Sequence, residues 1–148
     1  MLFRSNYLLA EQQPVAITGC AQTGLVGAIG GCLGANGYVR WKGNVSVQYD
    51  TPRYGVFVQE RFISKGRADP WDVVGVTVNR NAVPMVEYTD ITLSYSVGSG
   101  QVYFNVTNLF NRNPPETIIS AGAYDAMTSY DVYDVLGRRF ALGFRMNL

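Results

Sequence analysis

The residues of this chain that are best suited to chemistry lie in one segment, 116–137, near the end of the sequence. The segment contains three tyrosine–aspartate pairs: Tyr124 and Asp125, Tyr130 and Asp131, and Tyr133 and Asp134. Phenol hydroxyls donate and accept hydrogen bonds, and carboxylates accept them. Such pairs on a loop could contact a sugar, a cationic ligand or a ferric chelate. They could equally serve as loop hydrogen bonds and interfacial aromatic side chains, and both interpretations stay open.

The rest of the sequence offers no residue pattern that predicts catalysis. The chain has no histidine, so the commonest general base and metal ligand is missing. It also has no serine in the setting of a nucleophile and no paired carboxylates on a defined scaffold. We therefore expect no enzymatic activity, no metal site and no cofactor. Charged residues make up 16% of the chain and the formal net charge is +1, which argues against a basic nucleic-acid-binding face.

The final stretch, 138–148, alternates between apolar and polar or small residues. A period of two predicts a β-strand, because successive side chains of a strand point to opposite faces of the sheet. The polar or small face includes Arg139 and Arg145. A wholly apolar face suits a strand with lipid or a core on one side and water on the other. The apolar face consists of Phe140, Leu142, Phe144, Met146 and Leu148.

Similar alternation predicts four further strands, and a fifth is indicated near the N-terminus. The composition supports this, since tyrosine and glycine are abundant and good helix formers are scarce as runs. Short turns are predicted at 50–52 and 98–100, whereas the other three connections are long. The predicted strands cover 5–10, 40–49, 53–64, 87–97 and 101–110.

The alternation of short and long connections predicts a membrane barrel. Long loops without structure are unusual in compact soluble domains. Outer-membrane barrels have short periplasmic turns and long extracellular loops, and tilted strands of about ten residues cross a bilayer. We therefore predict an all-β fold, an antiparallel transmembrane β-barrel segment of about five or six strands of a larger barrel. Asp90, Arg139 and Arg145 are then expected to face the lumen.

Three stretches resemble the C-terminal end of TonB-dependent outer-membrane receptors. Residues 40–50 resemble a strand that enters a short periplasmic turn. Residues 106–111, which contain Asn108, Leu109 and Phe110 and are followed by two prolines, resemble the penultimate strand. Residues 133–140 resemble the tyrosine–aspartate, glycine–arginine and phenylalanine run that opens the last strand. The resemblance covers roughly the last hundred residues, and the chain ends on leucine where the family usually ends on an aromatic residue.

The resemblance implies a barrel of about 22 strands plugged by an N-terminal domain. Such receptors import ferric siderophores, vitamin B12 or oligosaccharides with energy from TonB. Residues 1–148 would then form the C-terminal part of the barrel, without the plug, in the outer membrane of a Gram-negative bacterium. The implied partners are the rest of the receptor, the TonB system through the plug, the barrel-assembly machinery through the last strand, and outer-membrane lipid.

The two cysteines, Cys20 and Cys32, lie in the first long connection, which the receptor interpretation places outside the cell. In that oxidising compartment we expect a disulfide, worth roughly 2–3 kcal/mol. The alternative is a pair of free, buried thiols.

Two other functions stay open at this point. One is a small outer-membrane barrel or adhesin that closes by self-assembly. The other is a soluble ligand-binding barrel of the lipocalin type, in which the apolar faces would line an inner cavity and the polar faces would meet water. The alternation of long and short connections argues against the second.

Overall fold

The computed structural model describes the backbone of residues 2–11 and all atoms of 39–68, 73–76, 79–117, 128 and 132–146. It is an all-β structure. Among these residues there is no helix long and apolar enough to cross a membrane. The described residues form eight strands: β1 (Leu2–Glu11), β2 (Trp41–Asp50), β3 (Tyr54–Ile63), β4 (Gly66–Arg67), β5 (Ala82–Val83), β6 (Val86–Val97), β7 (Gly100–Thr107) and β8 (Arg139–Met146).

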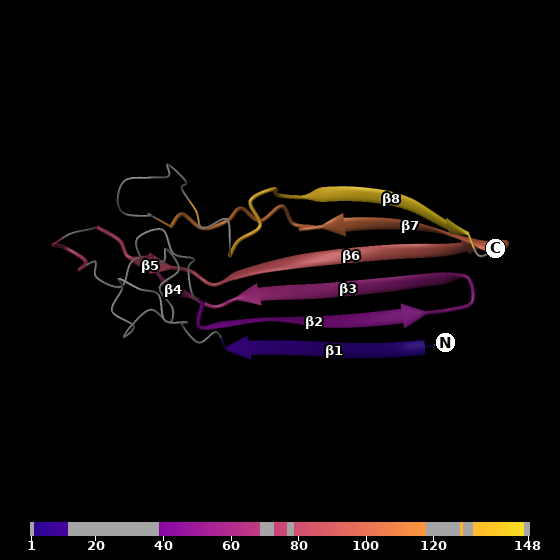
Figure 1. Cartoon of the computed structure of the whole chain (residues 1–148), viewed down its shortest axis with the longest axis horizontal. Coiled ribbons are helices and arrows are strands. Elements are labelled where there is room, and N and C mark those ends of the chain that lie inside the picture. The colour runs from indigo at the N-terminus through magenta and orange to yellow at the C-terminus, as the bar shows by residue number, and fades with distance from the viewer. Residues whose placement is uncertain are drawn as a thin grey trace, which may run out of the picture.

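Six strands form one antiparallel sheet in the order β1-β2-β3-β6-β7-β8, and β4 pairs with β5 in a small separate sheet. Each long strand therefore lies beside its neighbour in the sequence, apart from the short β4–β5 pair (Figure 1). The turns after β2 and β6 lie at one end of the sheet, which we call the turn end. The long connections start and finish at the opposite end, the loop end.

The two turns are fixed by local chemistry. The Thr51 amide donates to the Tyr54 carbonyl at 2.8 Å, and the Thr51 hydroxyl accepts from the Tyr54 amide at 2.9 Å. Gly98 adopts a φ of +59°, which glycine tolerates at no steric cost. These features confine the connections to residues 51–53 and 98–99.

The predicted strands are all observed, but some of them differ from the prediction in extent and two short strands are added. β1 begins earlier than the predicted 5–10, and residues 64–85 include β4 and β5. The strand predicted for 101–110 ends at Thr107 instead. It ends there because Asn108 turns the backbone into the left-handed region, with a φ of +56°, and so breaks the pairing with β8.

The pairing register gathers apolar side chains on one face of the sheet, the apolar face. Direct cross-strand partners share a face, and one such row crosses five strands. Rows on either side of it continue the pattern. The row consists of Tyr49, Val56, Leu93, Phe104 and Leu142.

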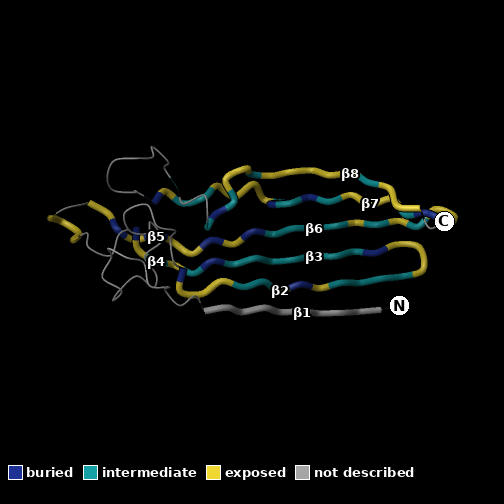
Figure 2. Tube along the Cα trace, in the orientation of Figure 1, coloured by how far each residue is buried: buried dark blue, intermediate teal, exposed yellow. Residues whose placement is uncertain are grey.

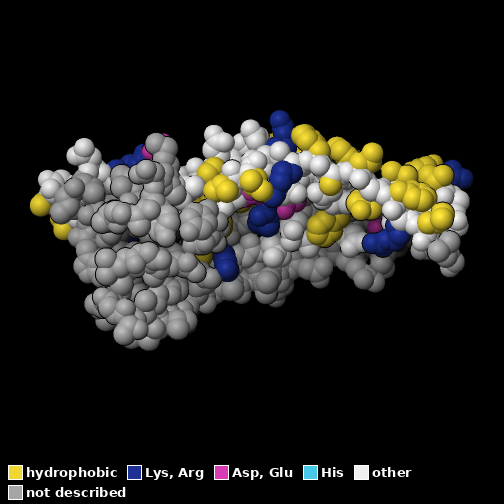
Figure 3. All heavy atoms as spheres, turned by 45° about the horizontal axis from the view of Figure 1, so that its top comes forward, with side chains coloured by type: hydrophobic (Ala, Val, Ile, Leu, Met, Phe, Trp, Pro, Cys, Tyr) yellow, Lys and Arg dark blue, Asp and Glu magenta, His cyan; other side chains and the backbone are white. Residues whose placement is uncertain are grey.

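Many apolar side chains of this face are exposed. Leu142 is 76% exposed and Phe144 is 60% exposed, and Leu93 on a central strand is still 44% exposed. Figure 2 shows β8 as exposed along most of its length, and in Figure 3 hydrophobic side chains gather along the strands toward the turn end. An apolar surface of this extent is the kind that marks an interface with lipid or another molecule.

The opposite face, the polar face, carries hydroxyl, amide and charged side chains. A hollow of about 330 Å³ lies on it near the turn end. Residues of β2, β3, β6, β7 and β8 line it. The polar groups that line it are Gln48, Asp50, Thr92, Ser94, Gln101, Tyr103 and Arg145.

The described hydrophobic core is small and lies at the loop end. Tyr88 and Val39 are 1% exposed there, and Tyr133 is 3% exposed. The connections thus pack on the loop ends of β3 and β6, and this packing fixes the position of residues 132–134 beside the sheet. The core consists of Val39, Ile63, Ala68, Val83, Val86, Tyr88 and Tyr133, with Val132 packed against it.

Gly143 provides room for an aromatic ring on the polar face. Tyr103 is its direct partner on β7, and the ring of Tyr103 occupies the space that a Cβ at position 143 would need. We expect Gly143→Val to displace this ring and to lower the free energy of unfolding by about 1–3 kcal/mol. Urea unfolding in detergent micelles would measure the loss.

Ala141→Val supplies the matched control, because Ala141 lies on the same strand and face. If Tyr103 is the cause, Tyr103→Ser should relieve most of the loss in a double variant. Additive losses would show that Gly143 is needed for another reason.

Candidate functional site

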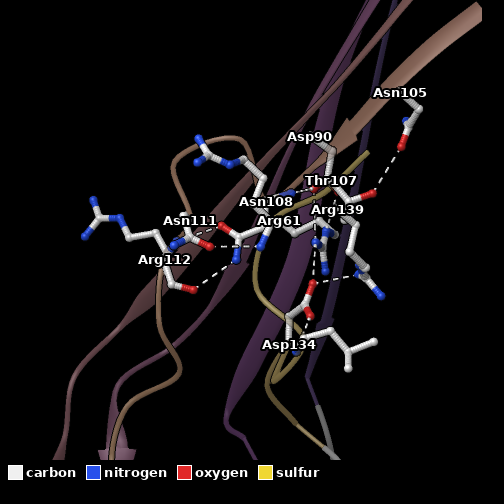
Figure 4. A network of polar contacts seen from close by, with 11 residues as sticks. Arg61, Asp90, Asn105, Thr107, Asn108, Asn111, Arg112, Asp134 and Arg139 are labelled. Carbon is white, nitrogen blue, oxygen red and sulfur yellow. Dashed lines mark hydrogen bonds and ion pairs between the residues drawn. The ribbon is translucent and has the colours of Figure 1, made fainter. Parts of the chain in front are cut away.

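A cluster of charged side chains lies on the polar face at the loop end (Figure 4). Arg61 of β3 and Asp90 of β6 are joined by two hydrogen bonds, from Nε to Oδ2 at 2.7 Å and from Nη2 to Oδ1 at 3.1 Å. The guanidinium of Arg61 also lies over the ring of Tyr88, 5.3 Å from its centre. A bidentate pair of this kind fixes the orientation of the guanidinium plane.

The carboxylate of Asp134 lies between two arginines that belong to different strands. Its Oδ2 accepts a hydrogen bond from Arg139 Nη2 of β8 at 2.9 Å, and lies 3.7 Å from Arg61 Nη2. Its Oδ1 accepts a hydrogen bond from the Leu136 amide at 3.2 Å. Asp134 itself lies on the connection that leads into β8, so the cluster ties this connection to the sheet.

Asn108 shapes the end of β7 beside the cluster. Its amide donates to Asp90 Oδ1 at 2.8 Å, and its side chain exchanges two hydrogen bonds with the backbone of Arg112, at 2.8 and 2.9 Å. Asn108 is fully buried. Asn111 has a φ of +52°, and its side chain accepts from the Arg138 amide at 3.0 Å, which holds the two ends of the last connection together.

The structure places the charged residues singled out in the sequence on one face. Asp90 and Arg139 belong to the cluster, whereas Arg145 lines the hollow at the turn end, opposite Gln101. Phe140, Leu142, Phe144 and Met146 lie on the opposite, apolar face. Leu148 lies outside the described residues.

Of the three tyrosine–aspartate pairs, only Tyr133 and Asp134 are described. The ring of Tyr133 is buried in the core, and the side chain of Asp134 is 8% exposed and paired with arginines. Both therefore contact the chain's own residues in this structure. The other residues proposed for ligand contact or for a disulfide lie outside the described part: Tyr124, Asp125, Tyr130, Asp131, Cys20 and Cys32.

Two members of the cluster, Arg61 and Asn108, were not proposed as site residues from the sequence. The position of Arg61 on the polar face follows from the strand period, since it alternates with Glu60 and Phe62. The strand period does not predict the partner of Arg61, because Asp90 lies on a different strand. The position of Asn108 at the end of β7 could have been inferred from one property, the tolerance of asparagine for left-handed backbone.

The buried phenol of Tyr133 is held in its neutral form. Burial raises the pKa of Tyr133 well above its usual value, and the nearby Tyr88 raises it further. The Tyr133 hydroxyl has no hydrogen-bond partner among the described residues. Within the same part of the chain, no three His, Cys, Asp or Glu side chains are placed to hold a metal ion together.

Comparisons with known proteins give no match: no protein-family model, no curated protein and no solved structure matches this chain.

The raised pKa of Tyr133 predicts a loss of stability in alkali. Above pH ~10 a tyrosine ionises in the unfolded chain, while Tyr133 keeps its proton in the folded chain. The folded state then binds one more proton, so stability falls as pH rises. We expect the unfolding free energy of Tyr133→Phe to fall less in alkali than that of the wild type. The difference between the two should grow by up to about 1.4 kcal/mol for each pH unit above 10.

The measurement is urea unfolding at a series of pH values between neutral and strongly alkaline. Tyr95→Phe, at an exposed ring, is the matched control for removal of one phenol. A Tyr133→Phe variant whose stability falls as steeply as that of the wild type would contradict the prediction.

Proposed function

We propose that the sheet is a segment of a transmembrane β-barrel, the C-terminal part of a TonB-dependent receptor in the outer membrane. The single observation that carries the membrane assignment is the pair of opposed faces. Exposed apolar side chains line most of one face over five strands, where Glu60 accepts a hydrogen bond from Thr89, and paired charges lie on the other. Lipid is the surrounding that makes this arrangement favourable, because the apolar side chains then leave water.

The dimensions of the strands support this proposal. β1, β2 and β3 each have 10 residues, and β6 has 12. A strand tilted by ~45° needs about 9–11 residues to cross a bilayer. The two short turns lie together at one end, which suits the periplasmic side, and the long connections lie at the other, which suits the outer side.

Tyrosines at the turn end support an interfacial position for that end. Tyr49 and Tyr54 lie on the apolar face with their ring centres 6.1 Å apart, and Tyr95, the direct partner of Tyr54, is 53% exposed. Tyrosine rings are enriched where a membrane meets water, because the ring is apolar and the hydroxyl is polar. The three rings would form part of the periplasmic aromatic belt.

The position of the hollow favours this proposal over a lipocalin-like barrel. In a soluble binding barrel the apolar face would line the inside. Here the hollow lies on the polar face, between Asp50 of β2 and Arg145 of β8. A polar inside and an apolar outside are the pattern of membrane barrels.

The open edges of the sheet support membership of a larger barrel. β1 and β8 each have one neighbour in the described sheet, so their outer backbone groups need partners. In lipid each unpaired group costs several kcal/mol. The remaining strands of the receptor would supply these partners, and β8 would meet the first strand of the barrel.

On this proposal, the function belongs to the whole receptor, which imports a scarce nutrient such as a ferric siderophore, vitamin B12 or an oligosaccharide. This segment supplies wall, lumen surface and three outer connections. TonB acts through the plug domain, and the assembly machinery acts on the last strand.

The coding sequence upstream of Met1 tests the receptor assignment directly. We expect the reading frame to continue for several hundred codons and to encode the other strands and a plug domain. A stop codon and a ribosome-binding site just before Met1 would overturn it, and would favour a small barrel that closes by self-assembly.

The membrane assignment makes a separate prediction at one strand. Leu142→Arg puts a charge on the apolar face, whereas Ala141→Arg puts the same charge on the polar face one residue away. We expect Leu142→Arg to lower the unfolding free energy by about 2–4 kcal/mol in lipid vesicles, and Ala141→Arg to cost far less. Equal losses at the two positions would contradict the assignment of the faces.

A further inference from the structure

Two arginines converge on one carboxylate oxygen that does not belong to the sheet. Nη2 of Arg139 lies 2.9 Å from Asp134 Oδ2, and Nη2 of Arg61 lies 3.7 Å from the same atom. Both arginines project from strands, whereas Asp134 comes from the connection before β8. The exposed fraction of the Asp134 side chain is 8%, against 34% for Arg61 and 47% for Arg139.

Arg61 keeps its orientation without Asp134. Two hydrogen bonds to Asp90 fix its guanidinium, and Asp90 is itself held by the amide of Asn108 at 2.8 Å. The ring of Tyr88 supports the guanidinium from one side. Departure of Asp134 would therefore leave a positioned donor in place.

The charges of the cluster balance only while Asp134 is present. Arg61 and Arg139 contribute two positive charges, and Asp90 and Asp134 contribute two negative charges. Without Asp134 the cluster carries one excess positive charge, on a polar face and at its loop end. Guanidinium groups bind carboxylates in charge-assisted hydrogen bonds, so a carboxylate is the group that restores the balance.

Asp134 can leave without disturbing the strands. The hydrogen bonds that hold its carboxylate, apart from those of the arginines, come from its own connection, through the Leu136 amide. The far part of this connection is fastened separately, because the Arg138 amide donates to Asn111 and the Arg138 side chain donates to the Leu109 carbonyl. Only residues 134–136 have to shift, while Tyr133 stays in the core at the loop end.

We propose that Arg61 and Arg139 form a binding site for a carboxylate-bearing ligand, and that Asp134 occupies this site as an internal substitute in the structure. Ligand and Asp134 compete, so binding displaces the Asp134 side chain from the two arginines while Tyr133 stays in the core. The binding site stands on the geometry of the cluster. Its place at the outer mouth of a transport path rests on the proposed function.

Citrate, which carries three carboxylates, is the probe. The full chain in detergent micelles is titrated with citrate by calorimetry, as wild type and as Asp134→Asn. Removal of the internal competitor should tighten citrate binding by about tenfold, because a tethered group competes at a high effective concentration. A purely structural ion pair would leave citrate binding absent in both proteins.

Two further variants separate the site from general charge effects. Asp50→Asn makes the same change in net charge on the same face, at the turn end, and should leave citrate affinity at the wild-type value. Adding Arg139→Gln to Asp134→Asn should abolish the gain. Equal tightening in the two single variants, or a gain that survives Arg139→Gln, would overturn the proposal.

Hydrogen exchange in the wild type gives a readout that does not depend on any variant. The Leu136 amide donates to Asp134, so citrate should speed its exchange while the amides of β7 stay protected. Unchanged exchange at saturating citrate would also overturn the proposal. These results are independent of the reading frame upstream of Met1 and of the membrane assignment of the faces, so the proposed function and this site can fail separately.

Discussion

Hydrogen-bonded pairing between neighbouring strands is the constraint on which the rest of the structure depends. Each pair of long strands is antiparallel, and its register decides which side chains share a face. A shift by one residue would move a whole strand's apolar side chains to the polar face. The separation of Leu93, Phe104 and Leu142 from Thr92, Asn105 and Ala141 therefore depends on the register of β6, β7 and β8.

On the polar face, the pairing register decides which charged side chains lie close together. It sets Arg61 beside Asp90 across two strands and leaves Arg139 free to reach Asp134. Buried or half-buried charges are tolerated only when they are paired, since an unpaired one costs several kcal/mol. The cluster and the small core at the loop end together give the connection before β8 a defined path, which the apolar face cannot provide.

The strands and their faces could be predicted from the sequence, because period-two alternation is a local property of the chain. The end of β7 could not, since Leu109 and Phe110 continue an apolar run and only the left-handed backbone of Asn108 ends the strand. The cluster could not either. Arg61 and Asp90 are far apart in sequence, and their meeting depends on register and not on composition. Tyr133, singled out as a residue for ligand contact, is buried because its connection folds back onto β6.

The difference in length between the two tight turns and the long connections also determines the order in which the strands pair during folding. Closing the turns at residues 51–53 and 98–99 costs little chain entropy, so the β2–β3 and β6–β7 hairpins are local units. An isolated hairpin forms in about 1–10 μs. Joining these hairpins requires closure of the longer segment 64–85, and adding β8 requires closure of 108–138. The pairs β3–β6 and β7–β8 are therefore non-local contacts, and they set the slow steps by which the preformed hairpins become one sheet.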